Sequence, residues 1–252
     1  MSVGDAFGKV FKWALDNGLL EKLPDLFRNQ HRILVLGSSG VGKTNFLNSL
    51  RQSVPEVIDA VNRTETATKN KIEINTEPFI FIDTPGQVHH QSRRYSAIRE
   101  EIGAGLSGVI NVVSYGYHEY DGGEEKAINK NGTVNQSFLA KSRAMELKLL
   151  DEWTPLLGSK EVGKWLVTVA NKADIWWTQK DEVLEFYRSG DYYKALGDAQ
   201  SLSHIVNHNC SVFHKYYSVG ELSGQFDDTD RDRARTALIS TLLELVGRGE
   251  GQ

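Results

Sequence analysis

The stretch from Gly37 to Thr44 reads GSSGVGKT and directly follows the apolar run Ile33-Leu34-Val35-Leu36. The apolar run predicts a buried strand, and the glycines after it let successive backbone N–H groups turn inward around a phosphate. Residues 45–50, NFLNSL, predict a helix whose N-terminal dipole faces that anion. A strand, a glycine-rich turn and a helix in this order predict a P-loop, which binds nucleotide phosphates.

Two side chains at the end of the loop have separate expected roles. Lys43 is placed to reach the β- and γ-phosphates as a cation, and the Thr44 hydroxyl is placed to ligate Mg²⁺. The residues expected to contact the phosphates are Gly37, Ser38, Ser39, Gly40, Val41, Gly42, Lys43, Thr44 and Asn45.

A predicted hairpin follows in the next part of the chain. Residues 71–75 alternate as a half-buried strand, and the apolar run 79–82 leads directly into Asp83. In a P-loop protein, an aspartate at the end of a neighbouring apolar strand holds Mg²⁺ through a water. Asp83 is therefore the second predicted metal residue.

Two further motifs occur in a specific order. Residues 83–86 read DTPG and residues 171–174 read NKAD, each at the end of a predicted strand. Together with the P-loop they resemble the translation-factor-related GTPases, the class that includes the small regulatory, Ras-like GTPases. The resemblance covers residues 31 to about 246. It implies an α/β fold of three layers, with a mostly parallel six-stranded sheet and helices on both faces.

The second motif predicts guanine recognition on chemical grounds. The Asp174 carboxylate can accept two hydrogen bonds, from a ring N–H and an exocyclic amino group, a donor pair that guanine presents and adenine does not. By resemblance, Asn171 contacts the base and the Lys172 stem lies across the nucleotide. The resemblance also implies a base-binding loop after the last strand, expected at residues 211–217. Ser218 and Val219 are its best counterparts, although they depart from the usual serine-alanine pair.

The loops near the terminal phosphate provide the predicted catalytic residues, which are Gln87, Lys43 and Thr68. Gly86 suits a γ-phosphate contact because its N–H can bond the phosphate and its dihedral angles are free to change after hydrolysis. Gln87 stands where the small GTPases place the glutamine that orients the attacking water. Thr68 is the expected Mg²⁺ and γ-phosphate residue of the first switch, with Thr66 as the alternative. His89 and His90 are further candidates for positioning water.

Composition sets limits on the other classes of function. The 252 residues carry a net charge of -4, which argues against general nucleic-acid binding. Cys210 is the single cysteine, so an intrachain disulfide is excluded. Without a run of about 20 apolar residues, a cytoplasmic protein is expected.

The GTPase domain is expected over residues 31–252. We predict three additions to a minimal GTPase. Residues 1–30 form an amphipathic helical extension that packs on the domain, docks a partner or lies on a membrane surface. A loop near 115–136 carries Tyr115, Tyr117, His118 and Tyr120, which favour a contact surface. Residues 175–206 form an enlarged helical region.

The helix expected at residues 92–106 has a strongly charged sequence. Its side chains predicted to be exposed are Arg93, Arg94, Arg99, Glu100 and Glu101.

These features predict a GTP-binding protein that hydrolyses GTP with Mg²⁺ and acts as a molecular switch. The alternatives are an autonomous or dimer-activated GTPase that drives assembly or remodelling, and a nucleotide-binding scaffold without hydrolysis. The expected partners are a protein effector or activator, or a second copy of the chain. They would bind through the switch loops, the 115–136 loop or the N-terminal helix.

Overall fold

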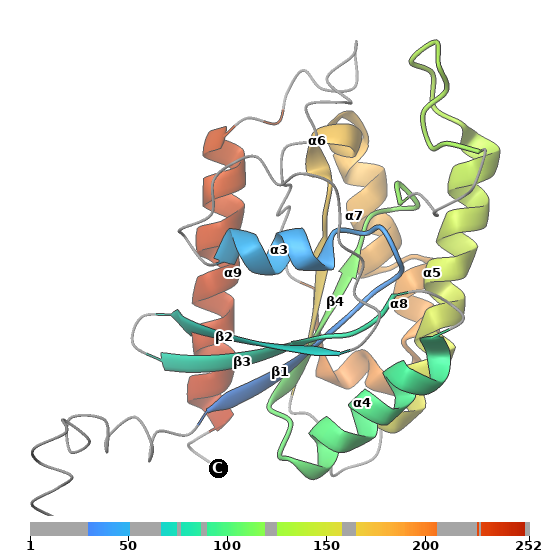
Figure 1. The fold of residues 1–252 in the computed structure, drawn as a ribbon. Coiled ribbons are helices and arrows are strands. Elements are labelled where there is room, and N and C mark those ends of the chain that lie inside the picture. The colour runs from blue at the N-terminus through green and yellow to red at the C-terminus, as the bar shows by residue number, and fades with distance from the viewer. Residues whose placement is uncertain are drawn as a thin grey trace, which may run out of the picture.

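The computed structural model describes residues 30–50, 67–74, 77–86, 90–118, 125–157, 165–205, 226 and 228–249, which contain both strands and helices (Figure 1). The strands are β1 (His31–Leu36), β2 (Thr68–Ile74), β3 (Glu77–Asp83), β4 (Gly108–Val113), β5 (Leu166–Ala170) and β6 (Ser203–Ile205). The α-helices are α3 (Lys43–Leu50), α4 (Gln91–Gly103), α5 (Gln136–Leu157), α6 (Ala173–Trp176), α7 (Lys180–Arg188), α8 (Asp191–Ala195) and α9 (Asp228–Gly249). Two 3-10 helices, η2 (Trp177–Gln179) and η3 (Gly197–Leu202), complete the set.

The strands form one sheet in the order β2-β3-β1-β4-β5-β6. The pairs β3-β1, β1-β4, β4-β5 and β5-β6 are parallel, and among the described strands only β2 runs antiparallel, against β3. A mostly parallel α/β sheet is thereby confirmed. In such a sheet the carboxyl ends of the strands share one edge, where ligands bind.

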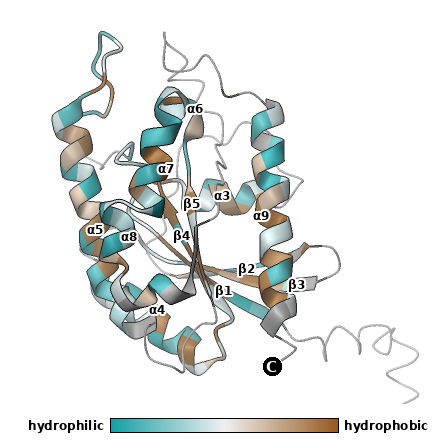
Figure 2. Cartoon of the chain, turned by 180° about the vertical axis from the view of Figure 1, so that it is seen from behind, coloured by the Kyte–Doolittle hydropathy of each residue, from teal (hydrophilic) through white to brown (hydrophobic). Residues whose placement is uncertain are grey.

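Helices cover both faces of the sheet because successive strand residues point to opposite sides. Leu34 and Leu36 pack into one core with α4, α5, α7 and α8, whereas Ile33 and Val35 pack into a second core with α3 and α9. Figure 1 shows α9 on the opposite side of the sheet from α4 and α5. Figure 2 shows hydrophobic central strands and helices banded in both colours, as amphipathic helices around a buried sheet should be.

The enlarged helical region differs from its prediction at its end. Helices and 3-10 turns run from Ala173 to Leu202, but Ser203–Ile205 is a strand, paired with Leu166–Thr168 of β5. Backbone pairing with the open edge of β5 therefore replaces the expected helix there. The last strand predicted at 211–217 and the N-terminal extension, apart from residue 30, lie outside the described residues. Within the described ranges, no helix has the length and hydropathy that a membrane span needs.

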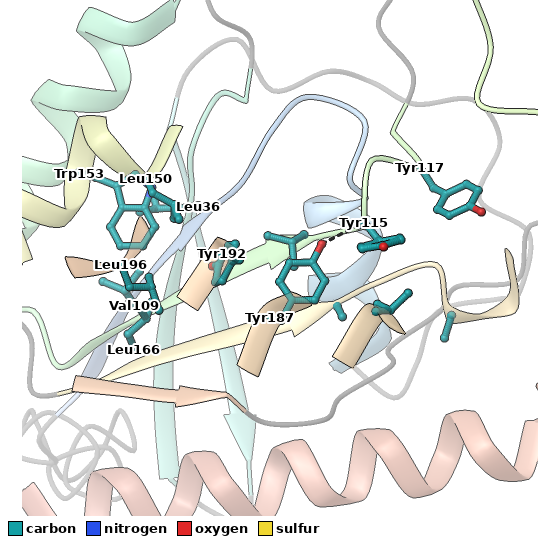
Figure 3. Close-up of a cluster of buried hydrophobic side chains, with 14 of the residues drawn as sticks. Leu36, Val109, Tyr115, Tyr117, Leu150, Trp153, Leu166, Tyr187, Tyr192 and Leu196 are labelled. Atoms are coloured by element: carbon teal, nitrogen blue, oxygen red, sulfur yellow. Dashed lines mark hydrogen bonds between the residues drawn. The ribbon is translucent and has the colours of Figure 1, made fainter. Parts of the chain in front are cut away.

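The prediction of an exposed aromatic surface after β4 is wrong for the three residues that can be judged. Tyr115, Tyr117 and His118 are 4%, 1% and 0% exposed. Tyr115 contacts Tyr187 of α7 (Figure 3), and His118 contacts Glu146 of α5. Together with the buried Tyr117, they offer no surface to a partner. Tyr120 lies outside the described residues.

Helix α4 also differs from its prediction. Arg93, Arg99 and Glu100 are exposed as expected, but Arg94 and Glu101 are 3% and 1% exposed. Glu101 is buried because Arg32 of β1 and Lys69 of β2 form ion pairs with it. The partners of Arg94 lie at the functional site described below.

Candidate functional site

The glycine-rich turn between β1 and α3 has a backbone that requires glycine at two positions. Gly37 has φ of +140°, and a Cβ there would collide with the carbonyl oxygen of Val112 on β4. Gly42 has φ of +92°, and a Cβ there would lie 2.6 Å from Asn171 Nδ2. Helix α3 follows at once, with the Phe46 N–H bonded to the Gly42 carbonyl at 2.8 Å. The turn thus presents its backbone at the carboxyl edge of the sheet, as a phosphate-binding loop does.

Lys43 lies inside this turn. Its Nζ donates hydrogen bonds to the carbonyl oxygens of Gly37 at 3.0 Å and Ser38 at 3.1 Å. Burial lowers the pKa of Lys43 to about 8, with a smaller lowering by the charge of Arg94 and an opposing effect of Asp83. A buried ammonium gains most from a nearby anion, so the loop suits a polyphosphate.

Thr44 and Asp83 meet at the predicted metal position. The Thr44 hydroxyl donates to Asp83 Oδ2 at 3.0 Å, and the β1-β3 register brings Asp83 beside Val35 at the end of β1. Hydroxyl and carboxylate oxygens are the hard ligands that Mg²⁺ prefers, so the donor set fits this ion. Among the described residues, no group of three His, Cys, Asp or Glu side chains could hold a metal. A metal site here would need phosphate oxygens as well.

Thr68 and Gly86 differ in their placement near Thr44 and Asp83. Thr68 is the first residue of β2, is exposed, and lies opposite Asp83 in the antiparallel register. Gly86 is buried, and a Cβ there would lie 2.5 Å from Lys43 Nζ and 2.6 Å from the Ser39 nitrogen. The DTPG segment therefore lies directly on the phosphate-binding loop, whereas Thr68 lies exposed at the start of β2.

The 171–174 motif follows β5, two strands away from β1. The Asn171 N–H donates to the Val113 carbonyl at 2.7 Å, and its Nδ2 donates to the Val41 carbonyl at 2.8 Å. Trp176 Nε1 donates to the Asn171 carbonyl at 2.8 Å. The buried Asn171 Oδ1 accepts no hydrogen bond in the part of the chain that the structure describes. Asn171 thus joins the base motif to the phosphate loop.

Lys172 and Asp174 complete the motif. Lys172 has φ of +61°, and its Nζ donates to the Tyr117 carbonyl at 2.7 Å, so the residues after β4 hold its side chain. Asp174 is half-buried in the first turn of α6. The structure therefore brings together the phosphate loop, Asp83, Gly86 and the NKAD motif. Gln87, His89, Thr66, Ser218 and Val219 lie outside the described residues.

A buried network behind the base motif was not predicted from the sequence. Glu146 of α5 accepts hydrogen bonds from the backbone N–H groups of Ser114 at 3.1 Å and Gly116 at 3.2 Å, and from the Tyr187 hydroxyl at 2.8 Å. His118 Nδ1 lies 3.4 Å from the same carboxylate. Figure 3 shows the Tyr187 hydroxyl directed at Tyr115, whose N–H lies 2.6 Å from it.

One signal in the sequence could have revealed this network. Glu146 lies on the same helical stripe as Leu139, Leu150 and Trp153, which are core residues. A carboxylate on an apolar stripe needs buried donors, and here it organises the loop whose Tyr117 carbonyl holds Lys172.

The arrangement defines a class of protein. A parallel α/β sheet with a glycine-rich loop, a buried lysine, and a threonine in contact with an aspartate at the carboxyl edge is a P-loop nucleotide-binding protein.

Comparison with known proteins points to the GTPases. Residues 32–147 match the family model described as 50S ribosome-binding GTPase, so this part of the chain is similar to that family and forms a GTP-binding P-loop GTPase domain. The resemblance drawn from the sequence motifs is thus confirmed. Among solved structures, the Arl6 BBS3 small GTPase from Trypanosoma brucei with the bound nucleotide analogue GppNp is similar at a TM-score of 0.46 and 12% identity, over 84% of this chain and 99% of that chain. No curated protein matches the chain.

Proposed function

We propose that this GTPase is a molecular switch whose state is set by the terminal phosphate of GTP. The observation that carries the proposal is the position of Gly86 against Lys43 and the Ser38–Ser39 backbone. A γ-phosphate bound by Lys43 would meet the Gly86 backbone, and its loss on hydrolysis would release the DTPG segment. The surface around this segment would then differ between the GTP and GDP states, and a partner could distinguish them.

Each site residue has a proposed part in GTP hydrolysis. The loop N–H groups and Lys43 stabilise negative charge on the phosphates, and Thr44 and Asp83 would hold Mg²⁺, with Thr68 as a further metal residue of the first switch. Bound Mg²⁺ supplies charge neutralisation on the β- and γ-phosphates. Gln87 orients the attacking water for in-line displacement, and Asn171, Lys172, Asp174, Ser218 and Val219 bind the base.

The domain limits and partners are part of the same proposal. Residues 31–252 form one GTPase domain, and residues 1–30 are an extension that docks a partner or packs on the domain. The proposed partner surface is formed by the switch segments, which are the first switch around Thr68 and the DTPG segment at residues 83–86. The 115–118 stretch is excluded from that surface because its side chains are buried.

Single-turnover GTP hydrolysis tests the proposal. Purified full-length protein is mixed with radiolabelled GTP, with and without Mg²⁺, over a hundredfold range of protein concentration. A switch that awaits an activator gives slow, Mg²⁺-dependent turnover at a rate independent of protein concentration. A rate that rises with concentration would indicate dimer-activated catalysis that drives assembly or remodelling. Binding without any hydrolysis would identify a scaffold and contradict the proposal. Lys43→Ala is the control, since it removes the phosphate cation.

A further inference from the structure

Arg94 is a buried arginine on α4 that is hydrogen-bonded to Pro85 and to Glu152. Its side chain is 3% exposed, Nη1 donates to the Pro85 carbonyl at 3.0 Å, and Nη2 donates to Glu152 Oε2 of α5 at 2.6 Å. Burying a guanidinium costs free energy unless charged and polar partners compensate, and Glu152 is itself only 15% exposed. Arg94 therefore joins α5 to the DTPG segment through a fixed, charge-assisted bridge.

The bond to Pro85 fixes more than a carbonyl group. The Pro85 C=O and the Gly86 N–H belong to one planar peptide unit, and in a trans unit they point in opposite directions. No cis peptide bond occurs among the described residues. Holding the Pro85 oxygen toward Arg94 therefore directs the Gly86 N–H away from α4.

The residue before this unit is anchored as well. The buried Thr84 hydroxyl donates to the Val35 carbonyl at 2.8 Å, at the end of β1. With Thr84 held by β1 and Pro85 held by Arg94, the peptide that carries the Gly86 N–H has little freedom to rotate. Gly86 itself packs on Lys43, and the charge of Arg94 contributes to the lowered pKa of Lys43, after the larger effect of burial.

We infer that Arg94, braced by Glu152, is a positioning residue that sets the Gly86 N–H for contact with the γ-phosphate of GTP. The inference rests on the proposed function, in which Gly86 reads the terminal phosphate. Arg94 touches no nucleotide in this scheme and acts only through the Pro85–Gly86 peptide. Its contribution is therefore specific to the triphosphate, because GDP has no phosphate at that position.

Equilibrium binding of GDP and of the non-hydrolysable analogue GppNHp to full-length protein tests the inference. Arg94→Ala should weaken GppNHp binding about tenfold, the equivalent of one charge-assisted hydrogen bond, and leave the GDP dissociation constant within about twofold. Glu152→Gln keeps the shape of its side chain and should give a smaller loss of the same selectivity. Arg93→Ala, on the exposed side of the same helix, is the matched control and should change neither constant.

Gly86→Ala separates failure of the inference from failure of the proposed function. If Gly86→Ala loses GppNHp selectively while Arg94→Ala and Glu152→Gln bind both nucleotides as wild type does, Gly86 reads the phosphate without Arg94 and the inference is wrong. If Arg94→Ala weakens GDP and GppNHp binding equally, Arg94 has a merely structural role, and the inference is also wrong. If Gly86→Ala itself binds both nucleotides as wild type does, the proposed function fails first. Should Arg94→Ala not fold, Glu152→Gln alone decides by the same comparison.

Discussion

Asn171 donates a hydrogen bond from Nδ2 to the carbonyl oxygen of Val41 at 2.8 Å, across a sequence separation of 130 residues. The bond is buried, and it joins the motif assigned to the base to the loop assigned to the phosphates. Gly42, the next residue, leaves space for the Asn171 amide, since a Cβ there would lie 2.6 Å from Nδ2. The two halves of the nucleotide site are therefore one connected structure.

This connection predicts the effect of Asn171→Ala. Loss of the side chain leaves the buried Val41 carbonyl without its donor, at a cost of about 1–3 kcal/mol. We expect GDP and GppNHp to bind on the order of tenfold to a hundredfold more weakly, by the same factor for both, and the thermal midpoint to fall. Calorimetric titration and thermal unfolding measure these effects. Asn129→Ala, which removes an exposed hydrogen bond to Thr133, is the control. A loss confined to one nucleotide would contradict the shared role.

Asp174→Asn tests the base chemistry. In the proposed site the Asp174 carboxylate would accept hydrogen bonds from the N–H and amino groups of guanine, whereas an amide carries both a donor and an acceptor. Xanthine presents a carbonyl group where guanine has its amino group, so the variant should lose at least about a hundredfold in GTP affinity and gain affinity for xanthosine triphosphate. Competition binding with both nucleotides measures the change. Asp191→Asn, an exposed first-turn aspartate of α8, should leave the preference unaltered. An unchanged preference in Asp174→Asn would remove Asp174 from the base site.

Local order in the sequence explains what could be predicted. The P-loop and Asp83 are specified within a few residues, because an apolar strand, glycines and a helix occur consecutively, and a parallel sheet then brings strand ends together. The contact of Thr44 with Asp83 is such a consequence.

The burial of several charged and aromatic side chains could not be predicted, because it depends on contacts with residues far away in the sequence. Arg94 and Glu101 resemble ordinary surface charges on a helix, and only the arrival of Glu152, Arg32 and Lys69 makes their burial possible. Tyr115 has φ of +54°, a conformation that no local pattern predicts, and the Tyr187 hydroxyl meets its N–H at 2.6 Å. A charged or aromatic residue type therefore does not by itself predict whether the side chain is exposed, because its distant contacts decide that.

Lys43 makes nucleotide binding depend on pH. With its pKa lowered to about 8, chiefly by burial, Lys43 loses its proton in the free protein as pH rises above about 8. Bound phosphates favour the charged form of Lys43 and raise its pKa, so nucleotide binding at pH 8.5 should be accompanied by proton uptake, and affinity should fall as pH rises through 8. Calorimetry of GDP binding in two buffers of different ionisation enthalpy measures the uptake. The same titration at pH 6.5 is the control, since Lys43 is already charged there. Equal uptake at both pH values would exclude Lys43 as the source.

Glu146 links the stability of the base-motif support to pH. Burial alone would raise the pKa of Glu146, but the hydrogen bond and charge of His118, with donors from Ser114 and Tyr187, outweigh burial and lower it below 4.5. For a carboxyl with a lowered pKa, the stabilisation is present above the unfolded value of 4.5 and is lost as pH falls through the folded value.

Glu146→Gln should therefore unfold with a free energy lower by about 3 kcal/mol at pH 7, because a buried charge network loses its anion. Below pH 4.5 the gap between wild type and variant should narrow, since wild-type Glu146 becomes protonated as well. Urea unfolding at pH 7, 5, 4 and 3.5 measures the gap. Glu182→Gln alters an exposed carboxylate that accepts a hydrogen bond from the Tyr115 hydroxyl at 2.6 Å. This control should lower the free energy of unfolding at pH 7 much less than Glu146→Gln does. A gap that stays constant from pH 7 to 3.5 would show that the Glu146 charge is not what stabilises the 114–118 segment.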